Sequence, residues 1–78
     1  MSKVIVWSKQ DCPNCVKAKT LLMLNGITEI EERLIGDKYS REDLLEAVPT
    51  ARSVPQIFID DVYIGGFSEI KEYLNGDQ

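Results

Sequence analysis

The sequence predicts an α/β fold in which strands and helices follow one another in the order β-α-β-α-β-β-α. An apolar run at residues 4–7 directly precedes a helical pattern at residues 13–25, and a second strand pattern follows at residues 27–35. Such a strand–helix–strand unit implies parallel pairing through a right-handed crossover. Two short apolar runs that flank Asp60 and Asp61 predict a β-hairpin. The length of 78 residues suits one small domain.

Four strands are expected where apolar residues cluster, at residues 3–8, 27–35, 54–59 and 62–64. The first strand is apolar on both faces, as in a buried central strand. In the second strand, Ile30 and Leu34 are expected to face the core, and Glu32 breaks the alternation because it shares their phase. The third strand has Pro55 near its start.

Three helices are expected, over residues 13–25, residues 41–48 and a segment from Ser68 to about residue 74. Pro13 suits the first helical position of the first helix. Ser40 is an N-cap candidate with Asp43 three residues later, and Pro49 ends that second helix. Ser68 is expected to cap the third helix. The residues expected to face the core are Val16, Ala18, Leu21, Leu22 and Leu24, then Leu44, Leu45 and Val48, and last Ile70, Tyr73 and Leu74.

Charge is unevenly distributed along a chain whose net charge is −4. Residues 1–25 contain four lysines against one acidic residue, whereas residues 26–78 contain five basic and twelve acidic residues. An acidic chain without a basic stripe does not indicate nucleic-acid binding. No apolar segment is long enough to span a membrane, and the first residues lead into no signal-peptide core. We therefore expect a reducing, cytoplasmic setting and no membrane partner.

The motif on which function depends is Cys-Pro-Asn-Cys at residues 12–15, which contains both cysteines of the chain. A strand, a short loop and Cys-x-x-Cys at the start of a helix are typical of a thioredoxin-like redox site. Cys12 would lie at the helix N-terminus, where the helix dipole favours a thiolate and lowers the thiol pKa below its free value of about 8.5. Cys15 would lie one turn further in and be more buried. We expect Cys12 to be the exposed nucleophile and Cys15 the resolving thiol.

Two other roles for the cysteines are weaker. A structural disulfide between residues three apart closes a very small loop and restricts the unfolded chain little. A zinc site needs four ligands, and the chain has no histidine and no third cysteine, so a site of Cys and His alone would need two chains.

Three segments resemble conserved segments of the glutaredoxin family, at residues 7–19, 51–59 and 65–69. They carry Cys-Pro-x-Cys, Val-Pro-Gln-Ile-Phe-Ile and Gly-Gly, in the family's order and over nearly the whole chain. The resemblance implies a thioredoxin-like fold with one domain over residues 1–78. It also implies a four-stranded mixed sheet of strand order 2-1-3-4, with the first and third helices on one face and the second helix on the other.

The resemblance also implies a glutathione site. Val54-Pro55 resembles the family's cis peptide, and Lys9 resembles its partner for the glycine carboxylate of glutathione. The amides of Phe67 and Ser68 are expected to bind the γ-glutamyl carboxylate, since helix N-termini bind anions. The implied glutathione-binding residues are Lys9, Ser53, Val54, Pro55, Gly66, Phe67 and Ser68, with Arg41 and Arg52 as weaker candidates. The chain departs from the family at Asn14, where tyrosine is usual, at Ser53, where threonine is usual, and at Phe67, where smaller residues are common.

The resemblance implies a glutathione-dependent thiol–disulfide oxidoreductase that reduces glutathione mixed disulfides and protein disulfides through Cys12 and Cys15. Glutathione would be the reductant, with no tightly bound cofactor and no metal, and the chain would be a monomer. Donation of electrons to a reductase such as ribonucleotide reductase is one possible use. The alternative is a module that binds an iron–sulfur cluster between two chains with two glutathiones, against which Pro13 argues.

Overall fold

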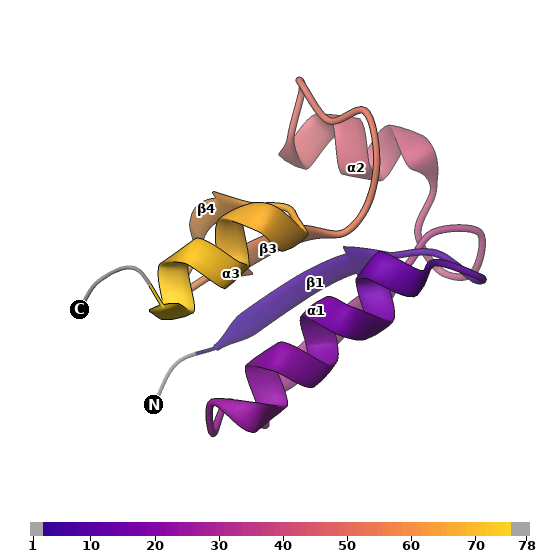
Figure 1. Cartoon of the computed structure of the whole chain (residues 1–78). Coiled ribbons are helices and arrows are strands. Elements are labelled where there is room, and N and C mark those ends of the chain that lie inside the picture. Colours follow the sequence, from indigo (N-terminus) through magenta and orange to yellow (C-terminus); the bar gives the residue numbers. More distant parts are fainter. Residues whose placement is uncertain (1–2, 76–78) are drawn as a thin grey trace.

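The computed structural model describes residues 3–75 and has the predicted element order (Figure 1). The elements are β1 (Val4–Ser8), α1 (Pro13–Leu24), β2 (Ile30–Leu34), α2 (Arg41–Ala47), β3 (Gln56–Ile59), β4 (Val62–Gly65) and α3 (Phe67–Asn75). The strands form one sheet of order β2-β1-β3-β4. Among the described residues, every helix is too short or too polar to cross a bilayer.

Strand β1 occupies the centre of the sheet, between a parallel and an antiparallel neighbour. Val4 pairs with Ile30 of β2 in the parallel direction and with Ile59 of β3 in the antiparallel direction. Val4 and Val6 are fully buried on one face and Trp7 is 2% exposed on the other. The apolar composition of both faces therefore places this strand inside the sheet, as predicted, and the mixed sheet of order 2-1-3-4 is confirmed.

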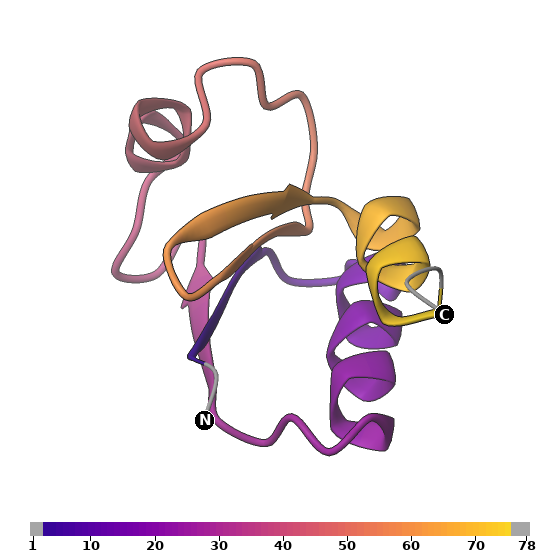
Figure 2. The same ribbon diagram turned by 90° about the vertical axis from the view of Figure 1, so that its left-hand side faces the viewer.

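Helices α1 and α3 lie side by side on one face of the sheet (Figures 1 and 2). The core of this face consists of Val4, Val6, Ala18, Leu22, Ile57, Ile59 and Ile70. Helix α1 contributes Ala18 and Leu22, and α3 contributes Ile70, with the partly buried Phe67 and Leu74 packed beside it, so each helix is held by side chains three or four residues apart. This layer carries the N-terminal ends of both helices to the same region of the molecule.

Helix α2 lies on the opposite side of the sheet (Figure 2). Leu44 and Val48 pack with Trp7, and the Trp7 and Tyr39 rings meet edge to face with centroids 5.3 Å apart. The Arg33 guanidinium lies 5.2 Å from the Trp7 centroid and 5.3 Å from that of Tyr39. The predicted division of the three helices between the two faces is confirmed.

The predicted turns and caps at two places are confirmed in detail. Asp60 and Asp61 have φ values of 51° and 69°, the left-handed conformation that a tight hairpin turn between β3 and β4 requires. Ser40 caps α2, with its hydroxyl accepting from the Asp43 amide while the Asp43 carboxylate accepts from the Ser40 amide. These reciprocal bonds form a capping box with aspartate in place of the usual glutamate.

The structure corrects several predicted boundaries, two of them through strand pairing. The second strand begins at Ile30 rather than at residue 27, because β1 offers only five residues for pairing. The third strand begins at Gln56 rather than at Val54, because its ladder with β1 begins with the Trp7–Gln56 pair and Pro55 has no N–H to donate. The first helix ends at Leu24, with Asn25 as its C-cap.

The inward positions predicted for α1 and α3 are only partly correct. Val16 is 58% exposed, Leu24 is 79% exposed and Tyr73 is 48% exposed. In α1 the buried face runs through Cys15, Ala18 and Leu22, so Val16 and Leu24 belong to a neighbouring stripe of the helix that no other element covers.

Candidate active site

The dithiol motif lies at the N-terminus of α1, where the sequence places it. Cys12 is the N-cap residue with extended backbone, Pro13 occupies the first helical position, and Cys15 lies in the first turn. The two Cα atoms are 5.3 Å apart and the two sulfurs form a disulfide. The Cys15 amide donates to Cys12 Sγ over 3.3 Å, so the helix start directs an N–H at this sulfur. Such a donor favours a thiolate once the disulfide is reduced.

The two cysteines differ in burial, although less than the sequence suggests. Cys15 is 1% exposed and Cys12 is 9% exposed. Cys15 is the deeper sulfur, as predicted, but Cys12 is not open to solvent in the disulfide form. Cys12 Sγ lies 3.7 Å from the carbonyl oxygen of Val54, which covers it from the loop before β3. The loop and the helix start thus meet at the sulfur of Cys12.

The loop residues Val54 and Pro55 are joined by a cis peptide bond, as the sequence resemblance implies. Pro55 is buried, and its carbonyl oxygen faces Gly66 at the start of α3. A Cβ atom on Gly66 would lie 3.2 Å from this oxygen, which is tighter than an ordinary van der Waals contact, so glycine suits this close approach. Three segments distant in the sequence therefore converge here. They are the start of α1, the Val54-Pro55 loop, and Gly66 between β4 and α3, which we call the Gly66 corner.

A pair of side chains that sequence reasoning did not single out supports the Val54 loop. Gln56 is only 7% exposed and its Nε2 donates to the Ser53 carbonyl over 2.8 Å. The Tyr63 hydroxyl of β4 donates in turn to Gln56 Oε1 over 2.6 Å. The available signal was Gln56 itself, a polar residue in an otherwise apolar strand. Because these bonds fix Ser53, they also hold the neighbouring Val54 carbonyl beside Cys12.

The start of α3 differs from the predicted cap at Ser68. The helix begins at Phe67, and Gly66 has the capping position because its carbonyl accepts from the Ile70 amide over 3.0 Å. The Gly66 amide donates to Glu69 Oε1 over 2.9 Å, so Gly66 is not a free donor for a ligand. The amides of Phe67 and Ser68, in the first turn, have no partner within the helix.

Gly65, the residue before this corner, is required by its conformation and its surroundings. Its φ is +129°, and a Cβ atom there would lie 2.6 Å from Glu69 Cγ. A side chain at this position would displace the carboxylate that caps α3.

The remaining predicted ligand residues lie around this centre. Lys9 is exposed in the loop between β1 and the dithiol, and Ser53 is exposed beside Val54. Arg52 is also exposed on that loop. Arg41 begins α2, which packs on the other face of the sheet from α1 and α3. The structure therefore gathers Cys12, Cys15, Val54, Pro55 and Gly66, whereas Arg41 lies at the start of a helix that packs on the other face of the sheet.

A polar cluster joins α1 to β2 one helical turn beyond Cys15. Lys19 Nζ donates to Glu32 Oε2 over 2.7 Å, and the same oxygen accepts from the fully buried hydroxyl of Ser8. The hydrogen bond from Lys19, and then that from Ser8, hold the pKa of Glu32 below its ordinary value. These two hydrogen bonds explain why a charged residue stands at Glu32, where the strand pattern calls for an apolar one. The Glu32 side chain points to the face that α1 covers and accepts from Lys19 and Ser8 there.

The dithiol lies at the positive end of the α1 helix dipole. The first turn of α1 contains no acidic residue that would neutralise this positive end. Within residues 3–75, no group of three or more histidine, cysteine or acidic side chains is arranged to hold a metal ion. A positive helix end beside two sulfurs can stabilise a thiolate and exchange it with a disulfide.

Comparison with known proteins agrees with this geometry. The sequence model of the glutaredoxin family matches residues 4–64, which include the dithiol, the Val54-Pro55 loop and β4. The chain belongs to the glutaredoxin family. Glutaredoxins are thiol–disulfide oxidoreductases, and the dithiol of this chain is the group that such chemistry uses.

Individual glutaredoxins resemble the chain over most of its length. A probable glutaredoxin of Synechocystis is 38% identical over 69 residues, which are 88% of this chain and 63% of that protein, so the chain spans less than two thirds of that relative. The crystal structure of glutaredoxin 1 from Francisella tularensis has a TM-score of 0.80 and 36% identity, covering 99% of this chain and 94% of that one. The crystal structure of a buckwheat glutaredoxin–glutathione complex has a TM-score of 0.71 and 27% identity, covering 96% and 71% of the two chains.

Proposed function

We propose that the chain is a glutathione-dependent thiol–disulfide oxidoreductase, acting as one domain over residues 1–78. The observation that supports this most directly is the position of Cys12. It is the N-cap of α1, it receives the Cys15 amide on its sulfur, and it lies under the Val54 carbonyl. A thiol in this position is activated for attack and is next to a backbone that an extended peptide can pair with.

The reaction with a glutathionylated protein takes two thiol–disulfide exchanges. The Cys12 thiolate attacks the glutathione sulfur of the mixed disulfide, a Cys12–glutathione disulfide forms, and the target protein leaves as a thiolate. A second glutathione thiolate then attacks the glutathione sulfur on Cys12. Glutathione disulfide is released and the Cys12 thiolate returns, so each turnover consumes one free glutathione and carries the glutathione of the substrate away in the released disulfide.

We propose that glutathione binds as an extended peptide along Val54. The glutathione backbone would pair with that of Val54, which its neighbours Ser53 and Pro55 hold in place. The glycine carboxylate of glutathione would bind the ammonium group of Lys9. The γ-glutamyl carboxylate would be bound by the amides of Phe67 and Ser68, because helix N-termini bind anions. The buckwheat relative whose structure contains glutathione supports this class of ligand.

Reduction of protein disulfides is the second part of the proposal. The mixed disulfide between Cys12 and a protein would be resolved by Cys15, which the first turn of α1 places next to Cys12. A monomer in the cytoplasm, with glutathione as its reductant and without a tightly bound cofactor, suits this activity. A reductase such as ribonucleotide reductase would then be one acceptor of its electrons.

The test is turnover of a glutathionylated peptide by the reduced protein, with glutathione, glutathione reductase and NADPH to record each glutathione disulfide. Wild type is expected to turn over and Cys12→Ser to be inactive, because serine cannot form the mixed disulfide. A Ser53→Thr variant restores the usual family residue and serves as the matched control that keeps activity. Activity in Cys12→Ser equal to that of wild type would refute the proposal.

A further inference from the structure

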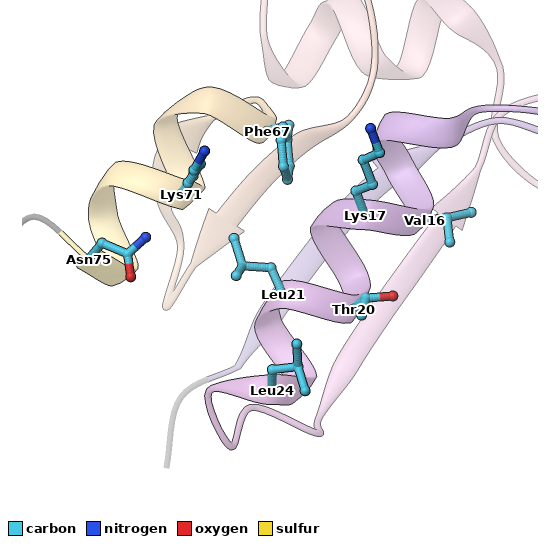
Figure 3. Close-up of a pocket in the computed structure, with 8 residues that line it drawn as sticks. All are labelled: Val16, Lys17, Thr20, Leu21, Leu24, Phe67, Lys71 and Asn75. Atoms are coloured by element: carbon cyan, nitrogen blue, oxygen red, sulfur yellow. The ribbon is translucent and has the colours of Figure 1, made fainter.

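An apolar groove separates α1 from α3 on the face that neither helix buries in the core (Figure 3). Its volume is about 290 Å³, and its lining residues are Val16, Lys17, Thr20, Leu21, Leu24, Phe67, Lys71 and Asn75. In Figure 3, Leu21 points from α1 toward α3 and the Phe67 ring points from the start of α3 toward Leu21. The lining residues of each helix recur every three or four positions. Each helix therefore forms one wall of the groove with a continuous stripe of side chains.

The groove is more exposed than a packed interface between two helices. Val16 is 58% exposed and Leu24 is 79% exposed. They belong to the stripe that the sequence pattern assigned to the core and that the structure leaves uncovered. Single exposed apolar residues need no explanation, but a hollowed row of them between two helices is typical of a recognition surface.

One end of the groove lies at the residues of α1 that directly follow the dithiol in the sequence. Val16 and Lys17 directly follow Cys15, and Phe67 directly follows the Gly66 corner that packs against the Pro55 carbonyl. From Val16 the groove runs along α1 to Leu24, a rise of about 12 Å at 1.5 Å per residue. An extended chain covers this length with about four residues at 3.3 Å each. A short segment leaving the dithiol can therefore occupy the whole groove.

The charges of the groove have one sign. Its two charged lining residues are Lys17 near the dithiol and Lys71 on α3, and none of its eight lining residues is acidic. Within residues 3–75, neither lysine forms an ion pair, whereas Lys3, Lys19 and Arg33 all do. The chain as a whole has a net charge of −4, so this surface is locally opposite to the rest of the molecule. Charge complementarity calls for an acidic occupant.

We propose that the α1–α3 groove docks the segment that flanks the disulfide of a protein substrate, and that this segment combines apolar with acidic side chains. The inference rests on the proposed reduction of protein disulfides and specifies which proteins are favoured. Apolar side chains lie between Leu21 and Phe67, and acidic side chains lie toward Lys17 and Lys71. The segment enters from the dithiol end, so docking holds the target cystine beside Cys12. Glutathione needs none of these side-chain contacts, because at Phe67 only the backbone amide is proposed to bind it.

The probes are three peptides with the same Cys-Gly-Ser-Cys disulfide ring and different four-residue tails after the second cysteine: Leu-Glu-Leu-Glu, Leu-Lys-Leu-Lys and Ser-Glu-Ser-Glu. The rate constant kcat/KM for their reduction is measured with glutathione as the electron source. We expect the Leu-Glu tail to be favoured about tenfold over each of the others, the ratio that 1.4 kcal/mol of docking energy produces. Salt should reduce the preference over the lysine tail, since exposed charges are screened.

Variants of the groove test where the preference arises. Lys71→Glu is expected to remove or reverse the preference for the acidic tail, and Leu24→Ser to remove that for leucine over serine. Lys38→Glu and Met23→Ser are the matched controls, because Lys38 and Met23 are exposed but do not line the groove. Both controls should keep wild-type preferences, and all four variants should keep wild-type turnover of hydroxyethyl disulfide with glutathione.

The outcomes separate this inference from the proposed function. Failure of wild type to turn over hydroxyethyl disulfide or any peptide would refute the oxidoreductase. Turnover of hydroxyethyl disulfide with equal rates on all three tails would refute only the docking segment. Sedimentation of the reduced protein as a dimer that Leu24→Ser dissociates would also refute it, because a second copy would then occupy the groove.

Discussion

The Nζ atom of Lys19 on α1 lies 2.7 Å from Oε2 of Glu32 on β2, and the buried hydroxyl of Ser8 on β1 donates to the same oxygen. Three elements are therefore held by one carboxylate, one helical turn from Cys15. The Lys19 and Ser8 hydrogen bonds lower the pKa of Glu32 from its ordinary value of 4.5. This stabilises the folded state as long as the carboxylate is ionised.

Glu32→Gln should destabilise the protein at neutral pH and have little effect in acid. The folded pKa of Glu32 is lowered, so its contribution is complete above 4.5 and is lost as the pH falls through the lower folded value. Its side chain is 38% exposed, so the difference at pH 7 should be about 1 kcal/mol. Urea unfolding at pH 7 and pH 3 measures both free energies, with Glu46→Gln as the exposed control. A difference that persists undiminished at pH 3 would contradict this account.

Cys12 should be alkylated before Cys15 in the reduced protein. The helix dipole and the Cys15 amide 3.3 Å from its sulfur favour the Cys12 thiolate, while Cys15 is 1% exposed. Iodoacetamide labelling followed by peptide mass analysis at several pH values gives the order, with the denatured protein as the control in which both thiols react alike. First labelling at Cys15 would exclude Cys12 as the nucleophile.

Lys9→Glu should weaken the use of glutathione more than it weakens folding. Lys9 is exposed beside the dithiol, and the exchange replaces attraction for a carboxylate with repulsion. An increase in KM for glutathione of about tenfold is expected, whereas an exposed charge alters stability by about 1 kcal/mol or less. Lys38→Glu makes the same charge change at an exposed site in the loop before α2 and should leave KM unchanged. Equal KM values for both variants would remove Lys9 from the binding site.

Cys15→Ser should separate the two activities. Removal of glutathione from a protein needs only Cys12 and a second glutathione, so this turnover should be kept or increased. Reduction of a protein disulfide needs resolution from within the mixed disulfide, so this turnover should fall to the background rate. The measurement compares a glutathionylated peptide with a peptide disulfide under one set of conditions. Equal loss on both substrates would mean that the two-cysteine route serves every substrate.

Patterns local in sequence were sufficient to predict most of the fold. The apolar run at residues 4–7 fixed β1 as the central strand, since both of its faces are buried. Asp60-Asp61 predicted the hairpin turn, and Ser40 with Asp43 predicted the start of α2. In the site, the order Cys-Pro-x-Cys placed Cys12 at the helix N-terminus with Pro13 in the first turn. Each of these signals depends on residues that lie only a few positions apart in the sequence.

Features that depend on packing between distant segments could not be predicted in this way. The start of α3 depends on the Glu69 carboxylate, which accepts from the Gly66 amide, so Ser68 was wrongly expected to be the cap. The limited exposure of Cys12 depends on Val54, 42 residues further along the chain. Leu24 lies in the apolar stretch at the end of α1, and its 79% exposure depends on which face of this helix the sheet and α3 cover.

The sheet order has a consequence for how the molecule behaves in crowded solution. Strands β2 and β4 form its two open borders, where unpaired backbone groups invite addition of a strand from another molecule. On β2 the border carries Glu31 and Arg33, paired over 2.8 Å, together with Glu32. The border formed by β4 is only four residues long and directly follows Asp60 and Asp61. The charged side chains of β2 and the short length of β4 both oppose the addition of further strands, so the protein is expected to stay dispersed at high concentration.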